Sequence, residues 1–293
     1  VHRRRDHGGL IFIDLRDKYG LTQLVFDPEI SEEIHAQASQ LRSEWVISVK
    51  GKVFHRGKGL ENPKLYTGAI EIKVHDFSIL SPAKTPPFSI CDEEIDVNEE
   101  LRLKYRYLDI RRGHVINNLE IRHKAMMTIR NYLDSQEFLE VQTPILAKST
   151  PEGARDYLVP SRVYPGSFYA LPQSPQIFKQ LLMVASVDRY FQIAPCFRDE
   201  DLRADRQPEF SQIDIEMSFD IPDQLFDLIE KMLAHVFKKS INVEIPSSFE
   251  RMTYADAIEF YGTDKPDLRF GMPLTRLDSI LKNCNFSIFK DQI

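Results

Sequence analysis

Two apolar segments joined by a dense charged loop constrain the fold of this chain more than any other stretch. The first, YFQIAPCF, ends at Phe197, and the second runs from Phe210 to Phe219. The second alternates, with Phe210, Gln212, Asp214 and Glu216 on one face and Ile213, Ile215, Met217 and Phe219 on the other. The charged loop is too long for a tight turn, so the sequence predicts a long hairpin with an exposed loop. Its arginines are suited to bind anions, although a merely solvated hairpin is the simpler alternative.

The composition is that of an ordinary soluble protein with room for more than one core. The chain has 293 residues, of which 42% are hydrophobic and 28% charged. Its cysteines, Cys91, Cys196 and Cys284, are too far apart for a disulfide framework or a CxxC metal site, which favours a reducing cytoplasm. We expect no membrane span and no secretion signal, because no apolar run is long enough and the first residues read VHRRRD. The net charge of −6 means that any contact with RNA must be local.

The N-terminal part of the chain has the strand pattern of a small barrel. Strands are predicted at 10–17, 21–27, 45–56 and 68–80, with an interposed helix from the N-cap Ser31 to Arg42. This pattern is compatible with a five-stranded OB barrel over residues 1–80, whose first strand would end at Val1 and His2.

A change of composition after residue 80 predicts a domain boundary. Residues 81–100 are rich in proline and acidic side chains and are predicted to be an extended linker. Residues 101–293 form a second domain, in which helical spacing begins at Leu101 and a longer helix runs from Val115 to Gln136. The predicted fold class is therefore α+β.

The sequence FRDEDLRADRQPEFSQID, which spans the charged loop, resembles motif 2 of class II aminoacyl-tRNA synthetases and is very close to that of bacterial-type aspartyl-tRNA synthetases. The resemblance implies an OB-fold anticodon-binding domain followed by a catalytic domain with an antiparallel sheet flanked by helices. It also implies an aminoacyl-tRNA ligase (EC 6.1.1 class) that uses ATP and Mg²⁺ to activate L-aspartate as aspartyl-adenylate and transfers it to tRNA(Asp).

The resemblance assigns the hairpin to ATP and to the end of the tRNA. Arg198 is the expected catalytic residue, because it would bind the α-phosphate and the substrate carboxylate. The expected ATP-binding residues are Arg198, Asp199, Glu200, Gln207 and Phe210. The loop arginines Arg203 and Arg206 would meet the acceptor end of the tRNA.

The aspartate site is expected on the helix that follows SPQ and on the loop 149–156. Ser174 is the predicted N-cap and Pro175 the first helical residue, so that Gln176 and Lys179 point together away from the apolar face. Such a pair is otherwise simply solvated. The residues that match aspartate-binding positions are Glu152, Gln176, Lys179, Arg198 and Asp214, with Lys179 as the cation for the side-chain carboxylate. No protein metal ligand is identified.

The barrel residues that match anticodon contacts are Arg5, Phe12, Gln23 and Glu71. Phe12 would stack on an anticodon base, unless it is a core residue and the neighbouring arginines form a solvated turn. His7 and Gly59 resemble the version of the family that also charges tRNA(Asn), which leaves open a ligase for both tRNAs.

Further expectations concern assembly and the extent of the chain. The segment FLEVQTPIL, with Pro144 near its end, looks like motif 1, a helix and strand that form the interface of a homodimer. The chain ends at SIFKDQI, before motif 3, so that we expect this chain alone to be inactive. The alternatives are a relative specific for asparagine or lysine, a tRNA-independent ligase with the same catalytic fold, and a non-catalytic RNA-binding OB protein.

Overall fold

A computed structural model describes residues 1–91, 96–150, 152–203, 206–219, 221–281 and 286. The chain divides into two compact units, Val1–Glu120 and Ile121–Ile293, each of which is described by itself. Some residues singled out in the sequence lie outside the described part: residues 92–95 of the expected linker, Pro151, Ala204, Asp205, Cys284 and the terminal SIFKDQI.

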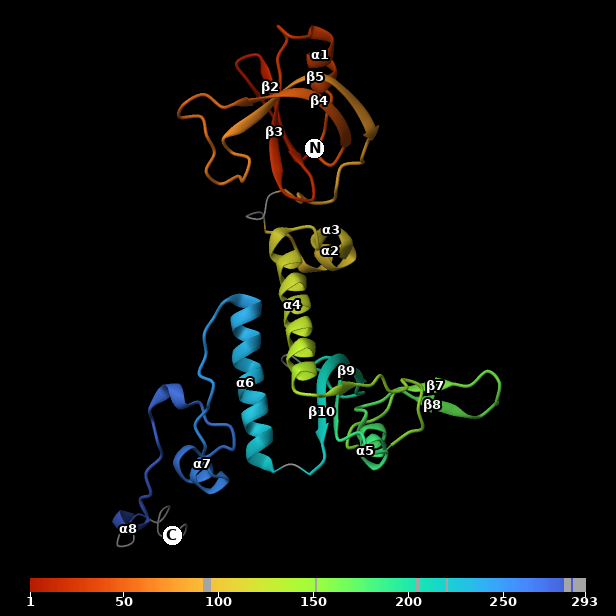
Figure 1. The fold of residues 1–293 in the computed structure, drawn as a ribbon, viewed down its shortest axis with the longest axis vertical. Coiled ribbons are helices and arrows are strands. Elements are labelled where there is room, and N and C mark those ends of the chain that lie inside the picture. The colour runs from red at the N-terminus through yellow and green to blue at the C-terminus, as the bar shows by residue number, and fades with distance from the viewer. Residues whose placement is uncertain (92–95, 151, 204–205, 220, 282–285, 287–293) are drawn as a thin grey trace. The chain divides into compact units, whose positions relative to one another are not determined.

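The first unit contains the predicted OB barrel (Figure 1). Its strands are β1 (Arg3–His7), β2 (Leu10–Arg16), β3 (Leu21–Phe26), β4 (Val46–His55) and β5 (Ile70–Ser81). They form one sheet in the order β1-β2-β3-β5-β4, in which only the β3 and β5 pair is parallel. Helix α1 (Glu32–Ala38) connects β3 to β4.

Alternation along the strands separates a buried core from an outer face. Ile11 and Ile13 of β2, Leu24 and Phe26 of β3, and Val74 of β5 are all at most 3% exposed. They pack in one cluster with Ala38 and Leu41 at the end of α1. The residues between them therefore project to the opposite face of the sheet, which is where the predicted anticodon contacts lie.

The prediction that the first strand ends at Val1 and His2 is wrong. Residues Arg3–His7 form β1, and Arg5 pairs with Phe12 of β2. The arginines are tolerated there because β1 is an edge strand whose side chains are all exposed. The predicted end of α1 at Arg42 is also wrong. Ser31 does cap the helix, accepting from the Ile34 amide, but α1 ends at Ala38 in tighter turns, with the Leu41 amide donating to the Ala38 carbonyl.

The segment after the barrel forms two short helices, α2 (Glu99–Lys104) and α3 (Arg106–Asp109), which are interrupted at Tyr105. The buried carboxylate of Asp109 accepts a hydrogen bond from Arg102 at 3.0 Å and another from Arg106. Burial raises the pKa of Asp109, but these two guanidinium groups outweigh it and hold the pKa below its ordinary value. The turn between the helices is therefore organised around one ionised carboxylate.

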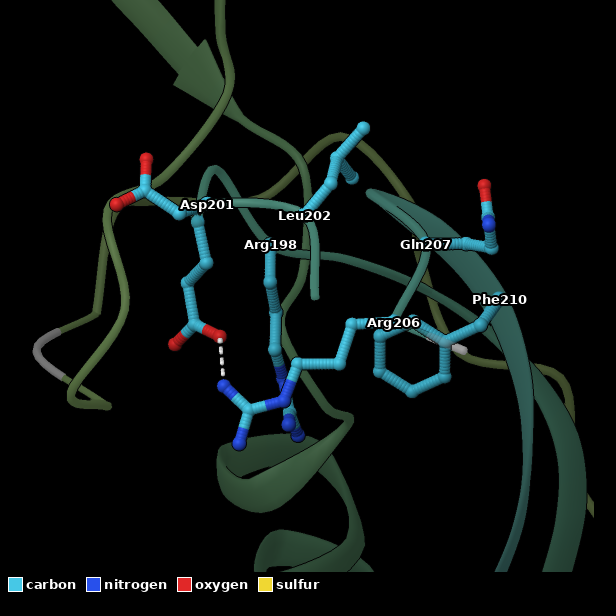
Figure 2. Close-up of a pocket in the computed structure, with 7 residues that line it drawn as sticks. Arg198, Asp201, Leu202, Arg206, Gln207 and Phe210 are labelled. Carbon is cyan, nitrogen blue, oxygen red and sulfur yellow. Dashed lines mark ion pairs between the residues drawn. The ribbon is translucent and has the colours of Figure 1, made fainter. Parts of the chain in front are cut away.

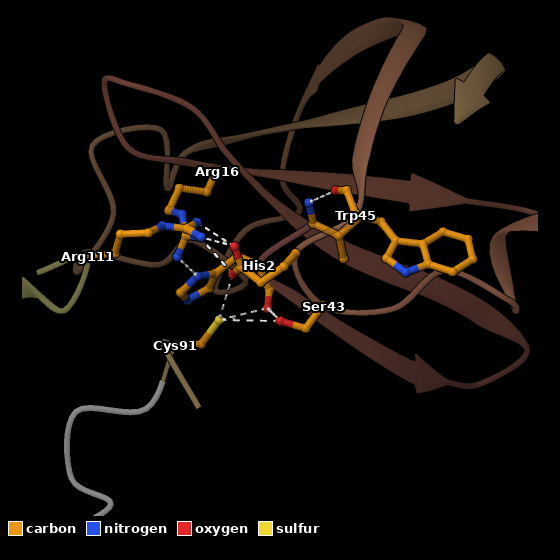
Figure 3. A network of polar contacts seen from close by, with 8 residues as sticks. His2, Arg16, Ser43, Trp45, Cys91 and Arg111 are labelled. Atoms are coloured by element: carbon orange, nitrogen blue, oxygen red, sulfur yellow. Dashed lines mark hydrogen bonds and ion pairs between the residues drawn. The ribbon is translucent and has the colours of Figure 1, made fainter. Parts of the chain in front are cut away.

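Glu44 joins this segment to the barrel within the first unit (Figure 3). Its carboxylate accepts from Arg16 of β2 at 2.8 and 2.9 Å and from Arg111, which follows α3. Burial raises the pKa of Glu44, but the two arginines lower the pKa by more, so that the net shift is downward. The backbone of Glu44 is left-handed, with φ of 69°, a strained conformation for a non-glycine residue. The ion pairs hold it in place.

The second unit is built on a sheet with the order β10-β9-β6. Strand β9 (Arg189–Phe197) lies between antiparallel β10 (Glu209–Met217) and parallel β6 (Leu139–Glu140). The long helix α4 (Gly113–Ser135) and helix α6 (Pro222–Ile241) pack on it through a cluster that includes Leu133, Phe191 and Met232. The remaining elements are β7 (Leu158–Pro160), β8 (Phe168–Ala170), α5 (Gln176–Val184), α7 (Tyr254–Tyr261), η1 (Leu268–Phe270) and α8 (Asp278–Leu281).

The strand predicted within FLEVQTPIL is much shorter than expected: β6 contains only Leu139 and Glu140. After it, the Val141 amide still donates to the Phe191 carbonyl, but the next contact is through a side chain, from Thr143 to Gln192. Pro144 has no N–H to extend the ladder. Among the described helices, none combines the length and the apolar content needed to cross a membrane.

Candidate active site

The predicted hairpin is confirmed, since β9 and β10 pair along their whole length from Phe197↔Glu209 to Arg189↔Met217. The alternation places Asp214 on the face covered by α5, while Ile215 and Met217 pack in the core cluster. The expectation that Phe219 continues the apolar face is wrong. β10 ends at Met217, and Phe219 is 98% exposed with φ of 60°, a left-handed backbone that breaks the alternation.

A pocket of about 420 Å³ opens where the charged loop leaves the sheet (Figure 2). Its lining consists of Arg198, Glu200, Asp201, Leu202, Arg206, Gln207 and Phe210. The guanidinium carbon of Arg198 lies 5.0 Å from the centroid of the Phe210 ring, a cation–π distance. An aromatic ring for a base and a fixed arginine for an anion therefore lie side by side, as a nucleotide requires.

The structure brings together four of the five residues predicted to bind ATP. Arg198, Glu200, Gln207 and Phe210 line the pocket, but Asp199 does not. The Asp199 amide instead donates to the Arg155 carbonyl at 3.0 Å, which ties the hairpin to the loop 149–156.

Of the two loop arginines predicted to meet tRNA, Arg206 also lines this pocket, with its Nη1 3.6 Å from Glu200 Oε2. Arg203 is exposed, and its carbonyl accepts from the Arg206 amide.

Lys179 lies at the centre of the predicted amino-acid site. Its ammonium donates to Asp214 Oδ1 at 2.8 Å and lies 3.4 Å from Glu216 Oε2. Burial lowers the pKa of Lys179, but the two carboxylates raise it more, so that the net shift is upward. Asp214 Oδ2 is buried and has no donor with acceptable hydrogen-bond geometry in the part of the chain that the structure describes. Helix α5 thus lies against β10 and brings Lys179 to the polar face of that strand.

The start of α5 differs by one residue from the prediction. Pro175 precedes the helix, which begins at Gln176, and Ser174 Oγ accepts from the Gln176 amide at 3.1 Å. The side chain of Gln176 is exposed. Glu152 reaches this helix start from the loop 149–156, since its carboxylate accepts from Ser174 Oγ at 2.8 Å. Glu152 also helps to line a second cavity of about 400 Å³.

Two buried glutamines support the site and were missed in the sequence. Gln173 is 2% exposed, and its side-chain amide makes two hydrogen bonds to the backbone of Ala154. It accepts from the Ala154 amide at 3.2 Å and donates to the Ala154 carbonyl at 2.9 Å. Gln192 is 4% exposed and accepts from Thr143 and from the Tyr190 hydroxyl, each at 2.9 Å. A glutamine in a strand or before a helix carries no period or spacing that distinguishes it, so no sequence signal pointed to either.

Cys196 is buried on β9. Burial raises the pKa of its thiol to about 11, and the charged groups of Arg198, Asp214, Glu152 and Lys179 act on it electrostatically. The thiol is protonated at neutral pH and is no candidate nucleophile.

The predicted anticodon residues form a hydrogen-bonded row on the outer face of the barrel. Arg5 donates to Asp14 at 2.6 Å and to Gln23 at 3.4 Å, and Gln23 donates to Glu71 at 3.1 Å. Phe12 shares this face, because it lies two residues from Asp14 on β2. It is not part of the barrel's core cluster.

His7 and Gly59, the two residues connected with tRNA(Asn), lie in different parts of the barrel unit. His7 is the exposed last residue of β1. Gly59 lies in the loop between β4 and β5, with φ of 84°, which favours glycine. No described contact joins them.

Over the described ranges there is no group of three or more His, Cys, Asp or Glu side chains that could hold a metal ion. The Mg²⁺ implied by the resemblance would come with the phosphates of a nucleotide.

Residues 98–288 match the family model described as tRNA synthetases class II (D, K and N), and residues 1–80 match the model of an OB-fold nucleic acid binding domain. Among curated proteins, the chain is 66% identical to Aspartate--tRNA(Asp/Asn) ligase of Protochlamydia amoebophila, covering 100% of this chain and 49% of the relative. It is 61% identical to the protein of that name in Chlamydia muridarum, covering 100% and 50%. The chain therefore spans about half the length of the curated relatives it matches.

Solved structures share the fold. Asparaginyl-tRNA synthetase from Pyrococcus horikoshii, complexed with asparaginyl-adenylate, has a TM-score of 0.75 at 20% identity, covering 100% of this chain and 67% of the other. Aspartyl tRNA synthetase from Entamoeba histolytica has a TM-score of 0.70 at 24% identity, covering 88% and 58%.

Proposed function

Since the chain belongs to the class II tRNA synthetases of the D, K and N group, we propose that it is the anticodon-binding and motif 2 part of a cytoplasmic aspartate–tRNA ligase. Its substrates are ATP, L-aspartate and tRNA(Asp). The observation that carries the proposal is the buried Lys179 ammonium, held between the carboxylates of Asp214 and Glu216. The names of the similar chlamydial proteins support the same amino acid.

Selection of aspartate follows from the charge of this site. The substrate's side-chain carboxylate pairs with Lys179, while the carboxylate of Asp214, the side chain of Gln176 and the carboxylate of Glu152 are acceptors for its ammonium group. An amide in place of the carboxylate would leave the Lys179 ammonium without the anion that the site is built to bind. Asparagine and lysine are therefore the weaker substrates.

Activation needs positioning and charge stabilisation rather than a protein base. The α-carboxylate of aspartate is already an anion, and it attacks the α-phosphate of ATP and expels pyrophosphate. Arg198 binds the phosphoryl oxygens and the attacking carboxylate, Phe210 stacks on adenine, and Glu200 accepts from its amino group. In the second step the terminal ribose hydroxyl of tRNA attacks the carbonyl carbon of the adenylate, so that the aspartyl ester forms, the hydroxyl proton is lost and AMP leaves, near the exposed Arg203.

The test is amino-acid-dependent exchange of pyrophosphate into ATP by the full-length polypeptide, with L-aspartate, L-asparagine and L-lysine compared. Exchange with aspartate alone supports the proposal. Exchange with asparagine or lysine instead supports the other members of the group, and RNA binding without any exchange supports a non-catalytic OB protein.

The proposed tRNA specificity includes tRNA(Asn), because the similar proteins are named as ligases for both tRNA(Asp) and tRNA(Asn). His7 and Gly59 are the positions in this chain that resemblance connects with it. Aspartylation of purified tRNA(Asn) alongside tRNA(Asp) tests it, and charging of tRNA(Asp) alone would exclude it.

We further propose a homodimer that uses β6 and the segment after it. Its apolar side chains are exposed in the single chain, with Leu139 at 55% and Leu146 at 53%. The molar mass in light scattering tests this, and a monomer at micromolar concentration would contradict it.

A further inference from the structure

The barrel carries two lysines beside an aromatic ring, and none of these three residues is among the predicted anticodon contacts. Lys52 and Phe54 lie on β4, and Lys73 lies on β5. The register pairs Phe54 with Glu71 and Lys52 with Lys73, so that all four side chains project from one face. The Nζ atoms of Lys52 and Lys73 lie 5.5 and 5.4 Å from the centroid of the Phe54 ring.

This cluster extends the hydrogen-bonded row that crosses the sheet. Gln23 of β3 donates to Glu71, which is the cross-strand neighbour of Phe54. The residues that alternate with them, Leu24 and Val74, are buried on the opposite face. The outer face therefore runs from Phe12 on β2, through Gln23 and Glu71, to Phe54 on β4.

The alternation of β4 sets the direction of these side chains. The register shifts between Lys50 and Gly51, where His75 of β5 is skipped, so the bulge lies on β5 and β4 keeps its alternation. A Cβ at Gly51 would lie 2.5 Å from both Ile72 Cγ2 and the Lys73 carbonyl oxygen, so only glycine permits this close approach of the strands. Lys52 and Phe54 therefore point to the face opposite Ile47 and Val49, which pack toward the core.

The Phe54 ring is not needed for the core. It is 38% exposed and absent from the core cluster, whereas Phe26 is fully buried within it. An exposed ring offers a surface on which any base can stack, and ammonium groups beside it attract the phosphates on either side. An exposed aromatic with two lysines therefore has the chemistry of a single-stranded nucleic-acid site.

We propose that Phe54, Lys52 and Lys73 form a second stacking subsite, for an unpaired RNA nucleotide next to the one that Phe12 and Gln23 contact. The subsite rests on the proposed tRNA-binding function of the barrel. It adds a nucleotide to the recognised stretch, and its affinity comes from stacking and phosphate contact rather than from base-edge hydrogen bonds.

The test measures binding of the full-length polypeptide to the anticodon stem-loop of tRNA(Asp), by fluorescence anisotropy at fixed ionic strength. Stacking of one base corresponds to a factor of about 5 to 150 in affinity, so Phe54→Leu should weaken binding within that range. Phe54→Tyr keeps the ring and should retain the affinity of the wild type. A Lys52→Gln, Lys73→Gln variant should reduce the dependence of affinity on salt.

Stem-loops with one abasic nucleotide at each loop position separate stacking from a general effect on the sheet. One abasic position should weaken binding to the wild type and have no further effect on Phe54→Leu, because both changes remove the same contact. A loss that is additive at every position would mean that Phe54 acts through the sheet, and it would overturn the proposal.

The outcomes also distinguish the subsite from the function it rests on. Unchanged affinity of Phe54→Leu, together with weakened binding of Phe12→Leu, would overturn the subsite and leave the tRNA-binding function intact. If the wild type does not prefer the anticodon stem-loop to a stem-loop with a scrambled loop, the tRNA-binding function itself fails.

Discussion

Replacement of Lys179 by methionine tests the central ion pair of the site. The Lys179 side chain is 12% exposed and that of Asp214 4%, so the pair is largely buried. Removal of one partner of a buried pair costs about 3 to 5 kcal/mol, because the other charge stays behind without compensation. We take the lower value, about 3 kcal/mol, because Glu216, the second partner of Lys179, is 34% exposed and remains hydrated without it.

The assay is urea unfolding followed by two signals. Far-ultraviolet circular dichroism reports the helices, most of whose residues lie in the second unit. Trp45, the single tryptophan of the sequence, belongs to the barrel unit, so that its fluorescence is an internal reference. For a slope of about 2 to 3 kcal/mol per molar urea, the expected loss moves the dichroism midpoint by about 1 to 1.5 M.

The matched control is Lys231→Met. Lys231 also pairs with a carboxylate, Asp227, at 3.2 Å, but its side chain is 59% exposed. An exposed pair at this helical spacing contributes about 0.3 to 0.5 kcal/mol. A midpoint shift for Lys179→Met no larger than that of the control would refute the reasoning, as would an equal shift in Trp45 fluorescence.

The pH dependence of the free energy of unfolding provides a further check on the stabilisation by Lys179. Because the pKa of Lys179 is raised above its ordinary 10.5, its stabilisation is complete below that pH and is lost only as the pH rises through the higher value of the folded protein. The difference between wild type and Lys179→Met should therefore stay constant between about pH 7 and pH 9.

Three other substitutions test separate parts of the structure. Arg198→Lys keeps the charge but loses the planar group over Phe210, and pyrophosphate exchange should fall about 100-fold or more; an unchanged rate would remove Arg198 from the mechanism. Glu44→Gln should lower barrel stability, followed by Trp45 fluorescence, by about 2 kcal/mol at neutral pH. The pKa of Glu44 lies below its ordinary 4.5, so the stabilisation by Glu44 is complete above pH 4.5 and is lost as the pH falls through the lower pKa of the folded protein. The stabilities of the wild type and Glu44→Gln should therefore converge in acid. A difference in stability that stays constant with pH would contradict this. Gln173→Leu removes both hydrogen bonds to Ala154 and should raise KM for aspartate about tenfold with a smaller effect on kcat; an unaltered KM would show that the loop is held by other contacts.

Patterns within single elements were predictable because they depend on local periodicity. The alternation of residues 210–217 was sufficient to expect β10 and its polar face. The helical spacing showed that Gln176 and Lys179 share a face, but the role of Lys179 came from the family resemblance. The N-cap at Ser31 was likewise readable, because one side chain satisfies one amide three residues away. The pocket lining of Arg198, Glu200, Gln207 and Phe210 followed from a family motif rather than from any period.

Other features could not be read from the sequence, because they depend on partners far along the chain. Arg3–His7 is a strand only because β2 offers it a hydrogen-bonding edge, and nothing in the arginine run itself indicates that. Gln173 supports the site only because folding brings Ala154 to its amide. Asp199 stands in the family motif, yet its backbone bonds to Arg155 and its side chain leaves the pocket.

The sequence by itself therefore determined the strands β2 to β5, the hairpin of β9 and β10 with its polar face, and which family the motif resembles. Tertiary structure alone decided the strand pairing that sets Phe54 beside Lys73, and the burial that makes the Lys179 pair strong. The physical reason is that period and capping are properties of neighbouring residues. Register and desolvation exist only once distant segments have met.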